Sequence, residues 1–134
     1  MEIVWVIVAG LAGWIFGAVW YGVFAKHWQA AVGLTQDDLK FGENAGVYIG
    51  SVIANILVAG MMRHVFVTSG VEGIVASVVS GLGLGLFIAG SFLWLNYSFS
   101  KKPMSLKLID IGHAAGSSAL IGLVLGLTLG AGGE

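Results

Sequence analysis

Asp110 and His113 have the residue types and the spacing to do chemistry, because they stand three residues apart in a largely apolar stretch. Residues three apart share one face of a helix, where a carboxylate and an imidazole can form a hydrogen bond. Such a pair can handle protons or ligate a metal. The structural alternative places Asp110 near the start of its helix, paired with Lys107 and favoured by the helix dipole. His113 would then form a hydrogen bond with a neighbouring helix.

Other polar and aromatic side chains are candidates for the same site because of where the chain places them. Asn55 stands inside an apolar stretch, where a polar group is costly and therefore marks a potential site. Hydrogen bonds to the Asp110–His113 centre are expected from Tyr21, Asn96 or Tyr97. Trp20 and Trp28 are expected to close its rim. The candidate polar residues are Asp110, His113, Asn96, Tyr97, Tyr21, Trp20, His27, Trp28 and Asn55.

Several classes of protein are disfavoured by composition. No serine–histidine–acid triad or paired carboxylates stand out, so we expect no enzyme and no cofactor. A metal site built from His27, Asp110 and His113 would have no spacing motif, and we expect none. The absence of Cys excludes a disulfide scaffold. Six basic and seven acidic residues leave no electrostatic footprint for nucleic acid.

The elements that position these residues are membrane-spanning helices. Only 10% of the 134 residues are charged and 57% are hydrophobic, whereas a soluble domain carries about 25% charged residues. A transmembrane helix needs about 20 mostly apolar residues, and the sequence contains four such stretches. It predicts an all-α, polytopic integral membrane protein, a single domain over residues 1–134 built as a four-transmembrane-helix bundle. The expected spans are 3–25, 45–65, 73–99 and 106–131.

Loop charges predict the orientation of the bundle. Lys and Arg in short loops stay on the cytoplasmic side. Loop 1, residues 26–44, and loop 3, which follows the third span, hold five lysines, whereas loop 2, residues 66–72, and its flank hold only Arg63. We therefore expect both termini outside and loops 1 and 3 cytoplasmic, in the plasma (inner) membrane. Thr35 followed by Asp38 predicts a short interfacial helix in loop 1, reaching Phe41.

Glycines at intervals of four predict close packing of helices. Small residues on one face let neighbouring backbones approach and gain dispersion contacts. The expected packing glycines are Gly13, Gly17, Gly81, Gly85, Gly112, Gly116, Gly122, Gly126 and Gly130. Gly83 lies between two of them, which suggests contact on several sides or a flexible point. Because every span has such a face, we expect a homo-oligomer, with Gly126 at a contact between copies.

Two stretches of the sequence resemble a known family. Residues 17–28, GAVWYGVFAKHW, are followed by Gly33, Thr35 and Asp38, and a second stretch joins Lys101 and Pro103 to residues 109–110. Together they resemble the family catalogued as domain of unknown function 1761, small bacterial membrane proteins. The resemblance implies four spans and implies no activity.

Two functions compete at this point. The first is channel-like or transporter-like passage of a small solute or ion, motivated by the polar residues inside the spans. The alternative is a structural module, or one that binds lipid or a hydrophobic cofactor without transport. Membrane lipids are the partners that the composition implies, and the identity of any small-molecule or ion substrate is left open.

Overall fold

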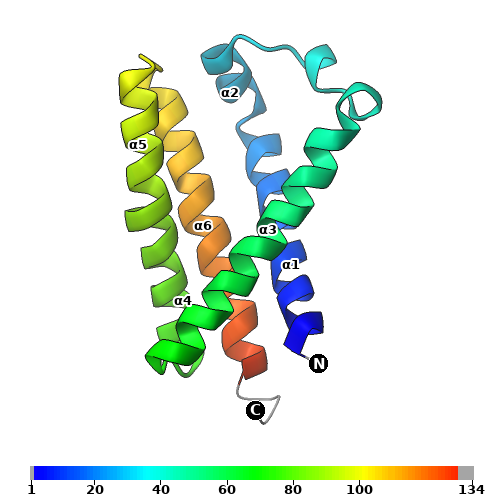
Figure 1. Cartoon of the computed structure of the whole chain (residues 1–134). Coiled ribbons are helices and arrows are strands. Elements are labelled where there is room, and N and C mark those ends of the chain that lie inside the picture. Colours follow the sequence, from blue (N-terminus) through cyan, green and yellow to red (C-terminus); the bar gives the residue numbers. More distant parts are fainter. Residues whose placement is uncertain (1, 130–134) are drawn as a thin grey trace.

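Four long apolar helical segments make up the protein, and each is long enough to cross a membrane. The structure is a computed structural model and describes residues 2–129. The first span is α1, Glu2–Val23, and the second is α3, Phe41–Ser69. The third runs continuously through α4, η2 and α5, which are Ile74–Gly83, Leu84–Ala89 and Gly90–Phe99. The fourth is α6, Met104–Leu129. The predicted all-α fold with four spans is confirmed, and Figure 1 shows their arrangement.

The ends of the second span differ from the prediction. We expected residues 45–65, but α3 begins at Phe41 and continues to Ser69. Its start is kinked at Asn44, whose amide donates hydrogen bonds to the carbonyls of Asp38 and Lys40. Its end is set by Gly70, which has a left-handed φ of 68° that favours glycine. The helix therefore extends four residues beyond the predicted span at each end.

Loop 1 contains two short helical segments where one was expected. The first is α2, Ala25–Val32, which ends at Gly33 in a left-handed conformation. The second is the 3₁₀ turn η1, Asp37–Leu39, at the predicted position. The amide and the hydroxyl of Thr35 donate hydrogen bonds to Asp38, and they lower the pKa of that carboxyl.

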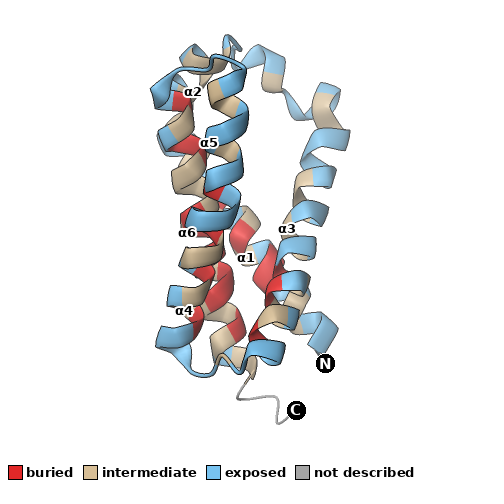
Figure 2. Cartoon of the chain, turned by 60° about the vertical axis from the view of Figure 1, so that its left-hand side comes forward, coloured by how far each residue is buried: buried red, intermediate tan, exposed pale blue. Residues whose placement is uncertain are grey.

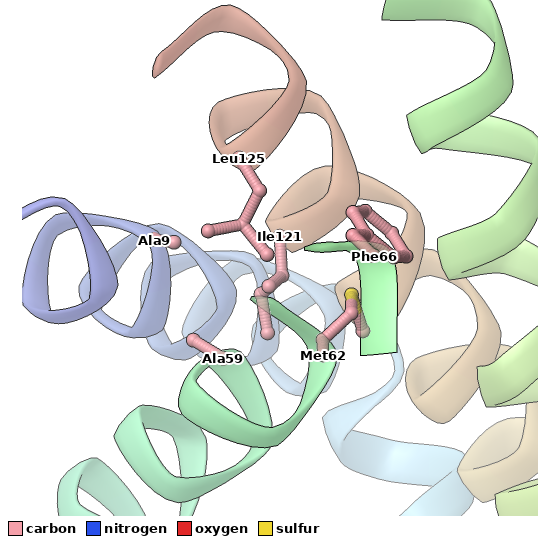
Figure 3. Packing of buried hydrophobic residues seen from close by; sticks show 6 residues of the cluster. All are labelled: Ala9, Ala59, Met62, Phe66, Ile121 and Leu125. Carbon is pink, nitrogen blue, oxygen red and sulfur yellow. The ribbon is translucent and has the colours of Figure 1, made fainter. Parts of the chain in front are cut away.

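The central helix is α6, which contacts every other span and α2. It is the most buried of the four spans, whereas α3 is the least buried. Figure 2 shows buried residues concentrated on α6 and on the parts of α1 and α4 that face it. In the half of the bundle near loop 2, six apolar side chains form a core that fastens α3 to α1 and α6 (Figure 3): Ala9, Ala59, Met62, Phe66, Ile121 and Leu125. Toward loop 1, α3 leans away from α5 and α6 (Figure 1).

Glycines of the third span allow its close approach to α6. A Cβ at Gly81 would overlap the carbonyl oxygen of Ser118, and one at Gly122 would overlap the carbonyl oxygen of Ser77. A Cβ at Gly126 would lie 2.7 Å from the side chain of Ser77. Gly126 therefore packs inside the protomer, which removes the reason for placing it between copies.

The π-helical turn η2 explains how this packing face continues along the third span. Ser77, Gly81 and Gly85 are four apart, but the next buried small residue, Gly90, follows after five. A π turn adds one residue to a helical turn. It therefore keeps Gly90 against α6, where a Cβ would lie 3.1 Å from Ile111. A Cβ at Gly83 would meet nothing within 4 Å, so of the two alternatives for this residue contact on several sides is wrong, and a flexible point stays a prediction.

The remaining packing glycines also serve contacts within the protomer. A Cβ at Gly13 would lie 2.7 Å from Ile121, and one at Gly112 would lie 2.6 Å from Trp20. Gly116 lies against the ring of Phe16. Gly130 lies outside the described residues. On α3, a Cβ at Gly46 or Gly50 would meet nothing within 4 Å, and the homo-oligomer stays a prediction.

Candidate functional site

Asp110 is the centre of a hydrogen-bonded cluster at the end of the bundle that holds loops 1 and 3. The hydroxyl of Tyr21 on α1 donates a hydrogen bond of 2.6 Å to Oδ1 of Asp110. The hydroxyl of Tyr97 on α5 donates one of 2.6 Å to Oδ2. The indole N–H of Trp28 on α2 donates a third, of 3.2 Å, to Oδ1. We call these four residues the Asp110 cluster, and it ties α1, α2 and α5 to α6.

The donors of this cluster suit an ionised carboxylate. A carboxylate only accepts hydrogen bonds, and here two oxygens receive three. Asp110 is 8% exposed, so an unpaired charge would be costly. The predicted pairing with Lys107 is wrong, because the ammonium of Lys107 lies 4.3 Å from the ring centre of Trp94 instead. The phenols already occupy the carboxylate, and a cation–π contact stabilises the lysine on the outer face.

The two tryptophans do more than close a rim. Trp28 belongs to the Asp110 cluster, as described above. The indole N–H of Trp20 donates a hydrogen bond of 2.9 Å to the backbone carbonyl of Ile109, and its ring covers Gly112. Aromatic side chains from α1 and α2 therefore bind α6 at Asp110 and at the residues next to it along the helix.

His113 lies one turn deeper than Asp110. Its ring centre is 4.9 Å from that of Tyr21 and 6.3 Å from that of Phe16. Gly17 leaves the space for it, because a Cβ there would lie 2.8 Å from Nε2 of His113. Within residues 2–129, the side chain of His113 has no hydrogen-bond partner, so Asp110 and His113 do not form the direct pair that their spacing suggested.

A second polar network crosses the middle of the bundle. The indole N–H of Trp14 on α1 donates a hydrogen bond of 2.8 Å to the hydroxyl of Ser51 on α3. The amide of Asn55 donates to the backbone carbonyl of Ser51 at 2.9 Å. The hydroxyl of Ser117 on α6 donates to the carbonyl of Gly13 at 3.2 Å and approaches Oδ1 of Asn55 at 3.5 Å. We call Trp14, Ser51, Asn55 and Ser117 the midspan network.

Two cavities have His113 and Asn55 in common in their linings. The larger, of about 1060 Å³, is lined by α1, α3, η2 and α6, and we call it the groove. The smaller, of about 230 Å³, lies between α1 and α3 and reaches Tyr21 and Tyr48. Asp110 lines neither cavity, because its neighbours enclose it.

The structure does not bring all the predicted site residues together in one site. Asn96 and His27 are exposed and outside the Asp110 cluster, the midspan network and the two cavities. Trp14, Ser51 and Ser117 were missed by the sequence analysis. Their signal was spacing: Ser117 follows His113 by four residues and Ser51 precedes Asn55 by four, so each pair shares a helix face.

Comparison with known proteins identifies the family and no activity. No curated protein and no solved structure matches the chain. The family model described as "Protein of unknown function (DUF1761)" matches residues 4–126, which is nearly the whole chain. The protein therefore belongs to this family of four-span membrane proteins.

Proposed function

We propose that the protein binds an apolar molecule that it takes up from the bilayer into the groove, with no catalytic step. The observation that carries this proposal is a large, mostly apolar cavity in which four of the five polar side chains, all except His64, come from the middle of α3 and α6. This is the second of the two functions that the sequence left open.

The size and lining of the groove suit a ligand of this kind. Its volume of about 1060 Å³ lies at the upper end of the range of about 300–1,000 Å³ for small-molecule sites. Most of its lining side chains are aliphatic or Met. The polar exceptions are Asn55, His64, His113, Ser117 and Ser118. Such sites combine an apolar wall with a few polar groups that orient the ligand.

The groove is accessible from the lipid phase. Leu57 and Met61 on α3 and Ile88 on η2 belong to its lining and are also exposed on the surface of the bundle. A molecule dissolved in the bilayer can therefore enter sideways, without passing the headgroups. The small burial of α3 supports this proposal, because a weakly packed wall can adjust to its occupant.

The Asp110 cluster has a supporting part in this proposal. All its hydrogen bonds are made within the protomer, and Asp110 contributes no atom to the groove. It fixes α6 against α1 and α5 and so positions His113 and Ser117. Binding should therefore survive conservative changes in the cluster as long as the bundle folds.

Native mass spectrometry of the protein released from its own membrane tests the proposal. Ala89→Trp would fill the groove at η2, and Ala76→Trp is the matched control, because Ala76 is exposed on the same span but outside the groove lining. We expect the native chain and Ala76→Trp to retain an apolar adduct through delipidation, and Ala89→Trp to lose it. The same adducts on all three proteins would mean nonspecific surface lipid and would refute the proposal.

Passage of a small solute is the second candidate, favoured by the position of His113 in the lining of both cavities. A path through the protein would have to join them there. Proton flux into vesicles, followed with an enclosed pH-sensitive dye, is the simplest assay. If the protein passes protons, vesicles with the native chain should show a larger flux than empty vesicles. Vesicles with the His113→Phe variant should lose this difference. Flux equal to that of empty vesicles would argue against proton passage.

A further inference from the structure

The polar part of the groove lies at the middle of the membrane. Ser117 stands 13 residues after Met104 and 12 before Leu129, the two ends of α6. Asn55 stands 14 residues from each end of α3. At about 1.5 Å of rise per residue, both lie about 20 Å from the ends of their helices. Phospholipid headgroups lie at the surface of the bilayer, so they do not reach this depth when their chains occupy the groove.

The groove offers no charge to a ligand. Among residues 2–129, no Asp, Glu, Lys or Arg lines it, and its midspan groups are an amide, two hydroxyls and an imidazole. Arg63, near loop 2, already lies 3.6 Å from Glu2. A charged group buried at the bilayer centre without a partner is costly. A polar group of the occupant that reaches the midspan side chains must therefore be neutral.

Three midspan groups have a free hydrogen-bond donor, and the second amide N–H of Asn55 can only donate, whereas a neutral imidazole and a hydroxyl can also accept. Within residues 2–129, the side chains of His113 and Ser118 form no hydrogen bond, and Asn55 uses one amide N–H on Ser51 and has a second. Its carbonyl is already approached by Ser117. A ligand that supplies an acceptor would satisfy these donors, which would otherwise stay unpaired away from water.

From the depth of these groups, the absence of charge and the three free donors, we infer that the occupant of the groove is a neutral apolar molecule with a carbonyl group, a ketone or quinone on a hydrocarbon chain. Its oxygen accepts a hydrogen bond from the imidazole N–H of His113. This inference rests on the proposed function and specifies the class of its ligand. No bond is formed or broken in this binding.

The test uses the full chain in phosphatidylcholine nanodiscs and two matched probes. One is a 1,4-benzoquinone carrying a ten-carbon isoprenoid chain, and the other is benzene carrying the same chain. Saturable binding of each is measured by native mass spectrometry. We expect the quinone to bind the native chain about five- to tenfold more tightly, the effect of about one hydrogen bond. His113→Phe should abolish the difference, and His113→Gln, which restores an N–H donor, should recover it.

The outcomes separate this inference from the proposed function. If both probes bind the native chain equally and Ala89→Trp removes both, the carbonyl specificity is wrong although the groove binds apolar molecules. If neither probe binds saturably, or if a second copy of the chain occupies the groove, both proposals fail. If His113→Phe does not fold, the comparison of the two probes on the native chain still tests the carbonyl specificity.

Discussion

Replacing Asp110 by Asn tests whether the hydrogen bonds of the Asp110 cluster stabilise the fold. The side-chain amide keeps one acceptor oxygen but turns the other into a donor, which faces one of the two phenols at 2.6 Å. Hydrogen bonds to a charged group contribute about 1.5–3 kcal/mol, and those between neutral groups about 0.5–1.5 kcal/mol. Each phenol bond therefore weakens by about 1–1.5 kcal/mol, so Asp110→Asn should destabilise the protein by about 2–3 kcal/mol.

Reversible unfolding in mixed micelles, driven by sodium dodecyl sulfate and followed by far-UV circular dichroism, measures this free energy. Asp37→Asn is the matched control, because Asp37 is exposed and forms only a surface ion pair with Lys40 at 3.4 Å. That substitution should change the free energy of unfolding by less than about 0.5 kcal/mol. Binding in the groove should persist in both variants, because neither residue lines it.

A double-mutant cycle decides whether the effect comes from the cluster itself. Tyr97→Phe should cost less in the Asp110→Asn background than in the native chain, because the two side chains share one hydrogen bond. The reasoning is refuted if Asp110→Asn is as stable as the native chain. It is also refuted if the cost of Tyr97→Phe is the same in both backgrounds.

Three further predictions follow from other contacts. Gly81→Leu should prevent α4 from packing on α6, because even a Cβ overlaps a carbonyl there, whereas Gly46→Leu has free space; size-exclusion chromatography should show aggregation of the first variant only. Trp14→Phe removes the indole donor to α3 and should cost about 1 kcal/mol in the same unfolding titration, and no loss would contradict a stabilising midspan network. Thr35→Val removes the hydroxyl but keeps the stronger backbone donor, so the pKa of Asp38 should rise part of the way toward 3.8 in an NMR titration. Because the native pKa is lowered, this turn is stabilised above the unfolded-state pKa and loses that stabilisation as the pH falls through the native value.

The spans could be predicted because the bilayer imposes a strong constraint on length and polarity. A charge such as Asp110 is rare enough within a span to indicate a buried group. The exact ends were less predictable, because the kink at Asn44 and the left-handed Gly70 shape the two ends of α3, and hydrophobicity does not report either feature. The π turn was in principle visible, since Gly85 and Gly90 are five apart where their predecessors are four apart.

The partners of the site residues could not be predicted with the same success. Lys107 was a plausible partner of Asp110 by spacing, but the phenols of Tyr21 and Tyr97 come from other helices. Whether these phenols lie near Asp110 depends on which helices are neighbours around α6. The periodicity of residues within one helix does not give that order. For the same reason the approach of Ser117 to Asn55 and the groove itself became visible only in the assembled bundle.

The central position of α6 has a consequence for how the protein is made. This helix follows the other three spans in the chain, yet α1, α4 and α5 all pack against it. Until the ribosome has delivered α6 to the membrane, the glycine face of α4, the phenols and the indole of Trp28 have no native partner. Of the earlier spans, only α1 and α3 have extensive native contacts with each other. The third span must therefore wait in the bilayer without its main native partner. Assembly is consequently completed by the last span to be inserted.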